Sequence, residues 1–121
     1  MTKFLAGMIL GIFATAVTLG GQRLASEKVV PPQVLVDNSK VRMVRWVLKP
    51  GEGTPLHSHD LPHVSVVIHG STIHAVSADG KVSDTHDKTG EAEFVPGGQP
   101  RHSFSNVGTE TFESISIELK K

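Results

Sequence analysis

The hydrophobic pattern of the chain changes once, near residue 30. An almost continuous apolar run extends from Phe4 to Leu19, whereas short β-branched runs separated by turn residues follow Pro31 and Pro32. Because such runs are typical of strands and no segment after residue 28 has a helical repeat, the pattern predicts an all-β sandwich or a jelly-roll β-barrel. The predicted strands cover residues 34–36, 41–48, 63–69, 71–77, 81–84, 91–95, 102–105 and 111–119.

Two local patterns sharpen this prediction. Asp79 and Gly80 separate two of the runs, and the Asp-Gly pair predicts a hairpin with a type I′ turn. The last run alternates, so that it has two sides with different compositions. One side carries Phe112, Ser114, Ser116 and Glu118, and the other carries Glu113, Ile115, Ile117 and Leu119.

The amino-terminal segment has the pattern of an export signal. Lys3 is the only charge before the apolar run, and small residues near Gly20 offer an imperfect cleavage site. With Gly20 and Gly21 the run also reaches the lower length limit of a membrane-spanning helix. Residues 1–28 are therefore predicted to be either a cleaved signal peptide or a retained membrane anchor, with residues 29–121 as the folded domain. Both alternatives place that domain outside the cytoplasm, in the periplasm or facing it.

Charge and cysteine content exclude several classes of function. The chain has twelve basic and twelve acidic residues, and removing Lys3, Arg23, Lys28 and Glu27 with the amino-terminal segment leaves nine against eleven. No basic patch supports nucleic-acid binding. The absence of cysteine excludes disulfides, thiolate ligands and a cysteine nucleophile. A domain of about 90 residues buries a modest core, so a closed barrel, a bound metal or a homodimer would each stabilise it.

Four of the histidines are candidate metal ligands. His57, His59 and His63 share parity within one short segment, so in an extended chain all three point to the same side. His102 follows almost forty residues later, after a Gly-Gly-Gln-Pro turn. Neutral imidazole is a good ligand for Mn, Fe, Ni, Cu and Zn, so this pattern favours one divalent transition metal ion. Surface positions are the simpler interpretation of His69, His74 and His86.

Two segments resemble the motifs of the cupin superfamily. Residues 51–70 match the first cupin motif at Gly51, His57, His59 and Gly70. Residues 90–106 match the second motif, with one additional residue before His102, at Gly90, Pro96, Gly98, His102 and Asn106. The resemblance covers roughly residues 34–119. It implies a small cupin-type jelly-roll β-barrel and a metal site that includes His57, His59 and His102.

The chain departs from the cupin pattern at the position of the first motif's glutamate, which His63 occupies. In this respect the chain resembles the small cupins that use four histidines. The resemblance implies that the metal ligands are His57, His59, His63 and His102. The alternative is a site of three histidines with His63 as a pocket-wall residue. Four neutral ligands leave a charge of +2 on a divalent ion, which favours an anionic small-molecule partner.

The resemblance implies a metal-dependent oxygenase or isomerase that acts on a small organic molecule. A non-catalytic periplasmic module that binds a metal or a metabolite is the alternative, and a metal that only stabilises the barrel is a third. The fold does not choose among them, because functions are added to folds at individual sites. The sequence identifies no general acid or base.

Overall fold

The computed structural model describes residues 28–121, and the predicted signal or anchor therefore lies outside the described residues except for Lys28. The described part is all-β, with ten strands and no helix. No helix in this part of the chain is long and apolar enough to span a membrane. The strands are β2 (Lys28–Val29), β3 (Gln33–Asp37), β4 (Val41–Leu48), β5 (Glu52–Gly53), β6 (His63–His69), β7 (Ser71–Ser77), β8 (Val82–Asp87), β9 (Ala92–Val95), β10 (His102–Asn106) and β11 (Phe112–Leu119).

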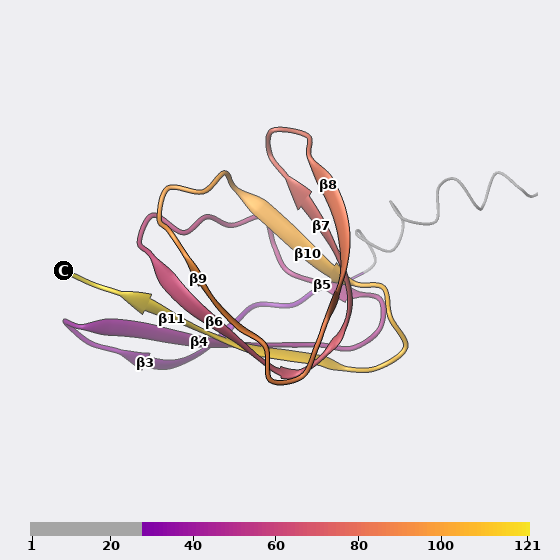
Figure 1. Ribbon diagram of the computed structural model, residues 1–121, viewed down its shortest axis with the longest axis horizontal. Helices are drawn as coiled ribbons and strands as arrows, with labels where there is room; N and C mark the ends of the chain where they lie inside the picture. Colours follow the sequence, from indigo (N-terminus) through magenta and orange to yellow (C-terminus); the bar gives the residue numbers. More distant parts are fainter. Residues whose placement is uncertain (1–27) are drawn as a thin grey trace, which may run out of the picture.

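The strands form two five-stranded sheets that face each other (Figure 1). One sheet has the order β2-β5-β10-β7-β8 and the other has the order β3-β4-β11-β6-β9. All pairings are antiparallel except the short contact between β2 and β5. Most neighbours in each sheet are distant in sequence, so residues from opposite ends of the domain meet in one barrel. The predicted all-β jelly-roll architecture is confirmed.

The hairpin between β7 and β8 differs from the predicted type I′ turn. The amide of Gly80 donates to the carbonyl of Ser77 at 2.9 Å, so Ala78 and Asp79 occupy the central turn positions. Gly80 has a φ of 91° and follows the turn, which is the arrangement of a three-residue hairpin loop with a bulge. The extra loop residue is accommodated by glycine because the left-handed region carries no Cβ penalty there.

The interior of the barrel is divided into an apolar end and a polar wall. Leu48, Val67, Ile73 and Phe112 form the buried apolar cluster. On β11, the side that faces the interior is the one with Phe112, Ser114 and Ser116, all of which are buried. The more apolar side of this strand, with Ile115, Ile117 and Leu119, therefore faces away from the interior.

Asn106 joins the two sheets and the following loop at the apolar end. It is fully buried, and its Nδ2 donates to the carbonyls of Leu48 and Glu110 at 2.8 and 2.7 Å. Its Oδ1 accepts hydrogen bonds from the Ser71 hydroxyl and the Gly108 amide at 2.8 and 3.0 Å. The side-chain amide thereby uses both donors and both acceptor sites, which satisfies its full hydrogen-bonding capacity.

Candidate metal centre

His57 and His102 are placed opposite each other by an isolated β-bridge. Their backbones exchange two hydrogen bonds, His57 N to His102 O at 2.9 Å and His102 N to His57 O at 2.8 Å. Directly opposite residues in an antiparallel pair project to the same face. The two rings consequently lie with centroids 4.6 Å apart. This bridge explains how a loop residue and the first residue of β10 come to share one site.

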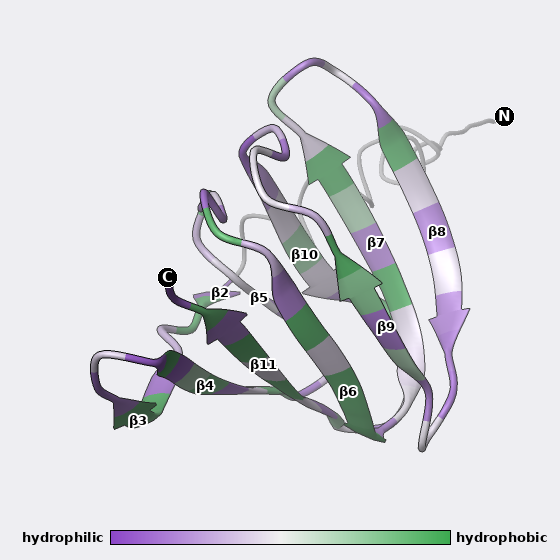
Figure 2. Ribbon diagram, turned by 60° about the vertical axis from the view of Figure 1, so that its left-hand side comes forward, coloured by the Kyte–Doolittle hydropathy of each residue, from purple (hydrophilic) through white to green (hydrophobic). Residues whose placement is uncertain are grey.

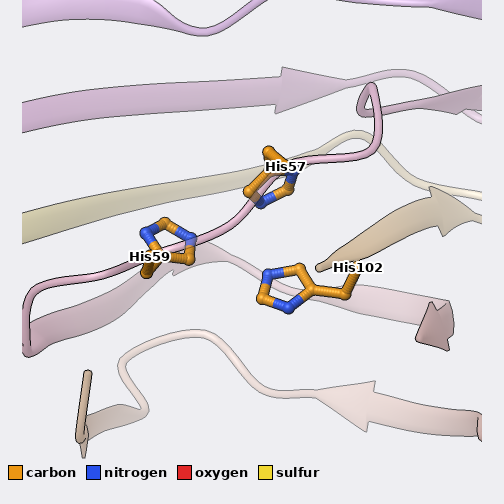
Figure 3. A group of neighbouring side chains, drawn as sticks. All are labelled: His57, His59 and His102. Carbon is orange, nitrogen blue, oxygen red and sulfur yellow. The ribbon is translucent and has the colours of Figure 1, made fainter. Parts of the chain in front are cut away.

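His59 completes a group of three (Figure 3). Each of His57, His59 and His102 offers a ring nitrogen, and these atoms all lie within 4.8 Å of one another. The loop before β10 holds His59 in place, because Gly98 donates its amide to the His59 carbonyl at 3.0 Å. A Cβ at Gly97 would lie 2.3 Å from the Asp60 carbonyl oxygen, so this close approach of the two loops requires glycine.

The three rings are oriented by bonds to their Nδ1 atoms. Nδ1 of His57 lies 2.8 Å from the Pro55 carbonyl, and Nδ1 of His102 lies 3.1 Å from the Pro100 carbonyl. A carbonyl can only accept, so both Nδ1 atoms carry the proton and both Nε2 atoms are bare. These Nε2 atoms are buried without a protein partner. Such unpartnered, bare nitrogens fit a divalent transition metal ion, because neutral imidazole binds through its lone pair.

His63 adjoins this group from the start of β6. Its ring centroid lies 4.2 Å from that of His59, and its side chain is buried with Nδ1 lacking a partner. Nonetheless, the group whose nitrogens all lie within 4.8 Å includes only His57, His59 and His102 among the described residues. The structure therefore brings together three of the four predicted ligands, and the participation of His63 stays a prediction.

Glu118 is a site residue that sequence reasoning missed. Its carboxylate lies 3.1 Å from Nδ1 of His59, and its side chain is only 15% exposed. Glu118 lies opposite His63 in the register of β11 and β6, which places it on the interior side of the sheet. The alternation of the last strand had put Glu118 on the Ser114 side. No sequence signal showed that this end of the strand reaches the histidines.

Two aromatic side chains pack against the histidines, Trp46 against His57 and Phe104 against His102. Trp46 stacks on His57 with centroids 5.4 Å apart, and Phe104 lies 4.8 Å from His102. The histidines border a cavity of about 540 Å³ between the two sheets. Its lining also includes hydroxyl groups of Ser65, Ser114 and Ser116. A small organic molecule could thus contact an aromatic wall, a hydroxyl wall and the histidines at once.

The remaining histidines lie outside the group, as the sequence predicted. The Nδ1 atom of His69 lies 2.7 Å from the Thr111 carbonyl, whereas His74 pairs with Asp84 and His86 with Thr72. These contacts are made by side chains at exposed or partly exposed positions.

Burial changes the titration of the candidate ligands. The pKa of His102 is lowered to about 4, mainly by burial and to a smaller extent by the neighbouring imidazoles of His57 and His59. Burial also lowers the pKa values of His57 and His63 from their ordinary value of 6.5. In the metal-free protein these rings therefore stay neutral, and able to bind a metal, under mildly acidic conditions.

We expect the metal-free protein to lose stability as the pH falls from about 6.5 towards 4. Below pH ~6.5 the unfolded chain takes up protons on these histidines while the folded chain does not, which favours unfolding. The part of the loss that is due to His102 is complete once the pH has passed the folded pKa of this residue, about 4. Thermal melting in a chelator across this range measures it. His102→Ala should give a shallower pH dependence, and an equally steep one would contradict the assignment.

A second prediction concerns the contact between Glu118 and His59. A carboxylate on the outer nitrogen of a metal-binding imidazole fixes its tautomer and raises its basicity, and removing such partners commonly weakens metal binding about 10- to 100-fold. We expect a loss of this size for Glu118→Ala and a smaller one for Glu118→Gln, because glutamine still accepts a hydrogen bond. Competition with a chelating dye measures the affinity. Glu113→Gln, on the outer side of the same strand, should leave it unchanged.

No protein-family model matches the sequence, and no curated protein is similar to it in sequence. Solved structures do match. A cupin domain from Bordetella pertussis Tohama I has a TM-score of 0.68 and 24% identity, covering 74% of this chain and 92% of its own. An RmlC-like cupin family protein from Methanocaldococcus jannaschii has a TM-score of 0.60 and 19% identity, with coverages of 74% and 78%.

A polyketide cyclase, RemF from Streptomyces resistomycificus, is also similar in structure. Its TM-score is 0.55 at 23% identity, and the alignment covers 74% of this chain and 64% of the cyclase. At these identities the matches establish the fold and leave the activity open. Together with the two-sheet barrel, they show that the described part of this chain has the fold of small cupin domains.

Proposed function

We propose that the protein is a metal-dependent enzyme that converts a small organic molecule, as an oxygenase or an isomerase. One divalent transition metal ion would be held by His57, His59 and His102, with His63 as a fourth ligand. The observation that carries the proposal is the pair of buried Nε2 atoms, on His57 and His102, that have no protein partner at the edge of a large cavity. Buried polar atoms are normally satisfied, so these two indicate a missing ligand.

The charge of the site favours an anionic substrate. When bound, a divalent ion supplies Lewis acidity, and a redox-active one also supplies electron transfer. Four neutral imidazoles would leave its charge at +2, and Glu118 would offset part of it from behind His59. The aromatic wall would exclude water from a bound substrate, whereas the hydroxyls of Ser65, Ser114 and Ser116 would orient its polar groups.

The similarity to a polyketide cyclase supports an enzyme acting on a small organic molecule, because this fold hosts such an activity in that protein. A non-catalytic periplasmic module that binds a metal or a metabolite is the second candidate. It is favoured by one observation: Glu118, the carboxylate next to the histidines, is engaged by His59 and lies 3.9 Å from Arg42. A carboxylate held in this way is less available as a general base.

Two measurements test the proposed function. Elemental analysis of protein purified without added metal should find about one transition metal ion per chain. Oxygen uptake and product formation with a panel of small diketones, catechols and keto acids should then detect turnover. A protein that holds zinc with four nitrogens and turns over no panel member would contradict the enzyme and support a structural metal.

The variant His63→Glu separates catalysis from metal binding. Glutamate at this position can still reach the site, so the metal and the fold should be retained. The charge of the centre would fall from +2 to +1, which weakens the attraction for an anionic substrate. We therefore expect activity to fall or to shift between substrates while the metal content is maintained. An unchanged substrate profile would remove His63 from the ligand set.

A further inference from the structure

The cavity beside the histidines is open along the seam between β8 and β9. Each of these strands is the edge of its own sheet, and the two diverge from the corner at residues 88–91 (Figure 1). After Val82, β8 is hydrophilic along most of its length (Figure 2). Ser83 and Thr85 on β8 and Glu93 on β9 line the cavity and are nevertheless exposed. A small molecule can therefore reach the histidines through this seam.

A row of polar residues leads from the seam into the cavity, next to the candidate ligands. Cross-strand register places Ser116 opposite Ser65, and Ser65 opposite Glu93. These three residues line the cavity and are named the polar row. The neighbouring pair in the same register is His63 opposite Val95. Glu93 is thus the diagonal neighbour of His63, at a distance of about 7–8 Å along the sheet.

The groups of the polar row lack partners. Ser116 is only 6% exposed and points into the cavity. Within residues 28–121, the hydroxyls of Ser65 and Ser116 make no hydrogen bond, and Glu93 makes neither a hydrogen bond nor an ion pair. Buried polar groups are normally hydrogen-bonded, so the row indicates a ligand. Because an ionised carboxylate can only accept, that ligand must supply hydrogen-bond donors.

The charges that line the cavity favour a cation at the seam. Lys81 is the only lysine or arginine of the lining, and Asp79 lies two residues before it in the turn after β7, so these two charges offset each other. Asp87 and Glu93 remain. The hydroxyl of Thr85 donates to Asp87 at 2.8 Å, which leaves Glu93 as the available carboxylate. A divalent ion on the histidines would make the opposite end of the cavity positive.

We propose that the polar row binds the protonated amine of a substrate whose carboxylate binds the metal. The substrate class is a short amino acid with its amine at the far end of the chain from the carboxylate. An ammonium group has three donors, which match the carboxylate of Glu93 and the hydroxyls of Ser65 and Ser116. This inference rests on the proposed function, because the metal holds the other end of the substrate.

Calorimetric titration of the purified protein with its own metal, in the absence of oxygen, tests the proposal. The probes are 5-aminopentanoate, pentanoate, which lacks the amine, and glutarate, which has a second carboxylate in its place. We expect 5-aminopentanoate to bind about 10-fold more tightly than pentanoate, since hydrogen bonds to charged groups are strong but the exposure of Glu93 reduces the gain. Glutarate should bind no more tightly than pentanoate.

Three variants assign the preference to the polar row. Glu93→Gln should bring the affinity for 5-aminopentanoate down to that for pentanoate, and it should leave the affinity for pentanoate unchanged. Ser116→Ala should reduce the preference about 3-fold, the share of one ordinary hydrogen bond. Glu113→Gln is the matched control, because it removes the same charge from the outer side of β11, where Glu113 pairs with Arg45. This variant should keep the full preference.

The outcomes separate this inference from the proposed function. Equal affinities for 5-aminopentanoate and pentanoate, or no binding of any probe, would overturn the amine site and leave the metal-dependent activity to its own test. A preference that survives Glu93→Gln would also overturn it, since the amine would then bind elsewhere. In chelator all three probes should bind weakly. Tight binding of 5-aminopentanoate in chelator that still depends on Glu93 would keep the amine site and contradict the role of the metal.

Discussion

Replacement of His102 by alanine should abolish tight metal binding and leave the metal-free fold intact. His102 offers one of the three clustered nitrogens, and its Nε2 is buried without a partner. The apparent binding free energy of a structural zinc site can be divided equally among its ligands. One ligand's share corresponds to a loss of metal affinity of about 100- to 1000-fold. Dialysis against buffered metal followed by elemental analysis measures the affinity.

The melting temperature gives a second readout of the same variant. Bound metal stabilises the native state by mass action, by about 2.7 kcal/mol at a free concentration of 100 times Kd. Wild-type protein should therefore melt higher in metal than in chelator, and His102→Ala should melt at the same temperature in both. In chelator the variant should be at least as stable as wild type, since it removes an unsatisfied buried nitrogen.

His86→Ala is the control for the metal experiment. His86 is exposed and its side chain pairs with the Thr72 hydroxyl at 3.3 Å, away from the candidate ligands, so its loss should change the metal affinity and the stability little. If His86→Ala weakened metal binding as much as His102→Ala, the metal would bind to surface histidines. The candidate centre would then be wrong.

The strands and three of the site histidines could be predicted because both depend on local patterns. Eight strands were predicted from alternation, β-branched runs and turn residues. All eight are present, with small shifts at their ends. The additional residue before His102 did not displace this ring, because the loop absorbs it and the bridge between His57 and His102 fixes the register. Motif spacing was therefore sufficient to predict that His57, His59 and His102 lie together as candidate ligands.

Features that depend on long-range register could not be predicted. Glu118 reaches His59 only because β11 lies between β4 and β6, and a single sequence does not specify that order. The sequence distinguished the two sides of the last strand, but it did not show which side faces the cavity. The turn at Asp79–Gly80 was assigned to the wrong type because the position of its hydrogen bond depends on the strand register.

The interior of the barrel has a polar part that borders the histidines and a separate apolar part. Polar residues on the interior side of β6 and β11 line the cavity and reduce the apolar core to one end, around Leu48 and Phe112. A small domain with so limited a core depends on a few well-satisfied polar groups at that end. Asn106 is the most buried of them.

Replacement of Asn106 by alanine should destabilise the protein by about 4 kcal/mol or more, because each buried partner left without a hydrogen bond costs about 1–3 kcal/mol. Four partners lose their bond: the carbonyls of Leu48 and Glu110, the Ser71 hydroxyl and the Gly108 amide. A loss of this size is a large fraction of the total stability of a small domain. Urea unfolding in chelator, at one protein concentration and followed by fluorescence of the single tryptophan, Trp46, measures it.

Two further variants separate the hydrogen bonds of Asn106 from its volume. Asn106→Asp keeps the size and the acceptor but turns a carboxylate oxygen towards two carbonyls, so it should be no more stable than Asn106→Ala. Asn38→Ala is the control: Asn38 also accepts two backbone hydrogen bonds, from Lys40 and Val41 at 2.8 and 3.0 Å, but at an exposed turn. It should cost only about 1 kcal/mol, because water replaces the lost partner. If Asn106→Asp were as stable as wild type, the two carbonyls would have found other donors. The apolar end of the barrel would then be held by packing rather than by this amide.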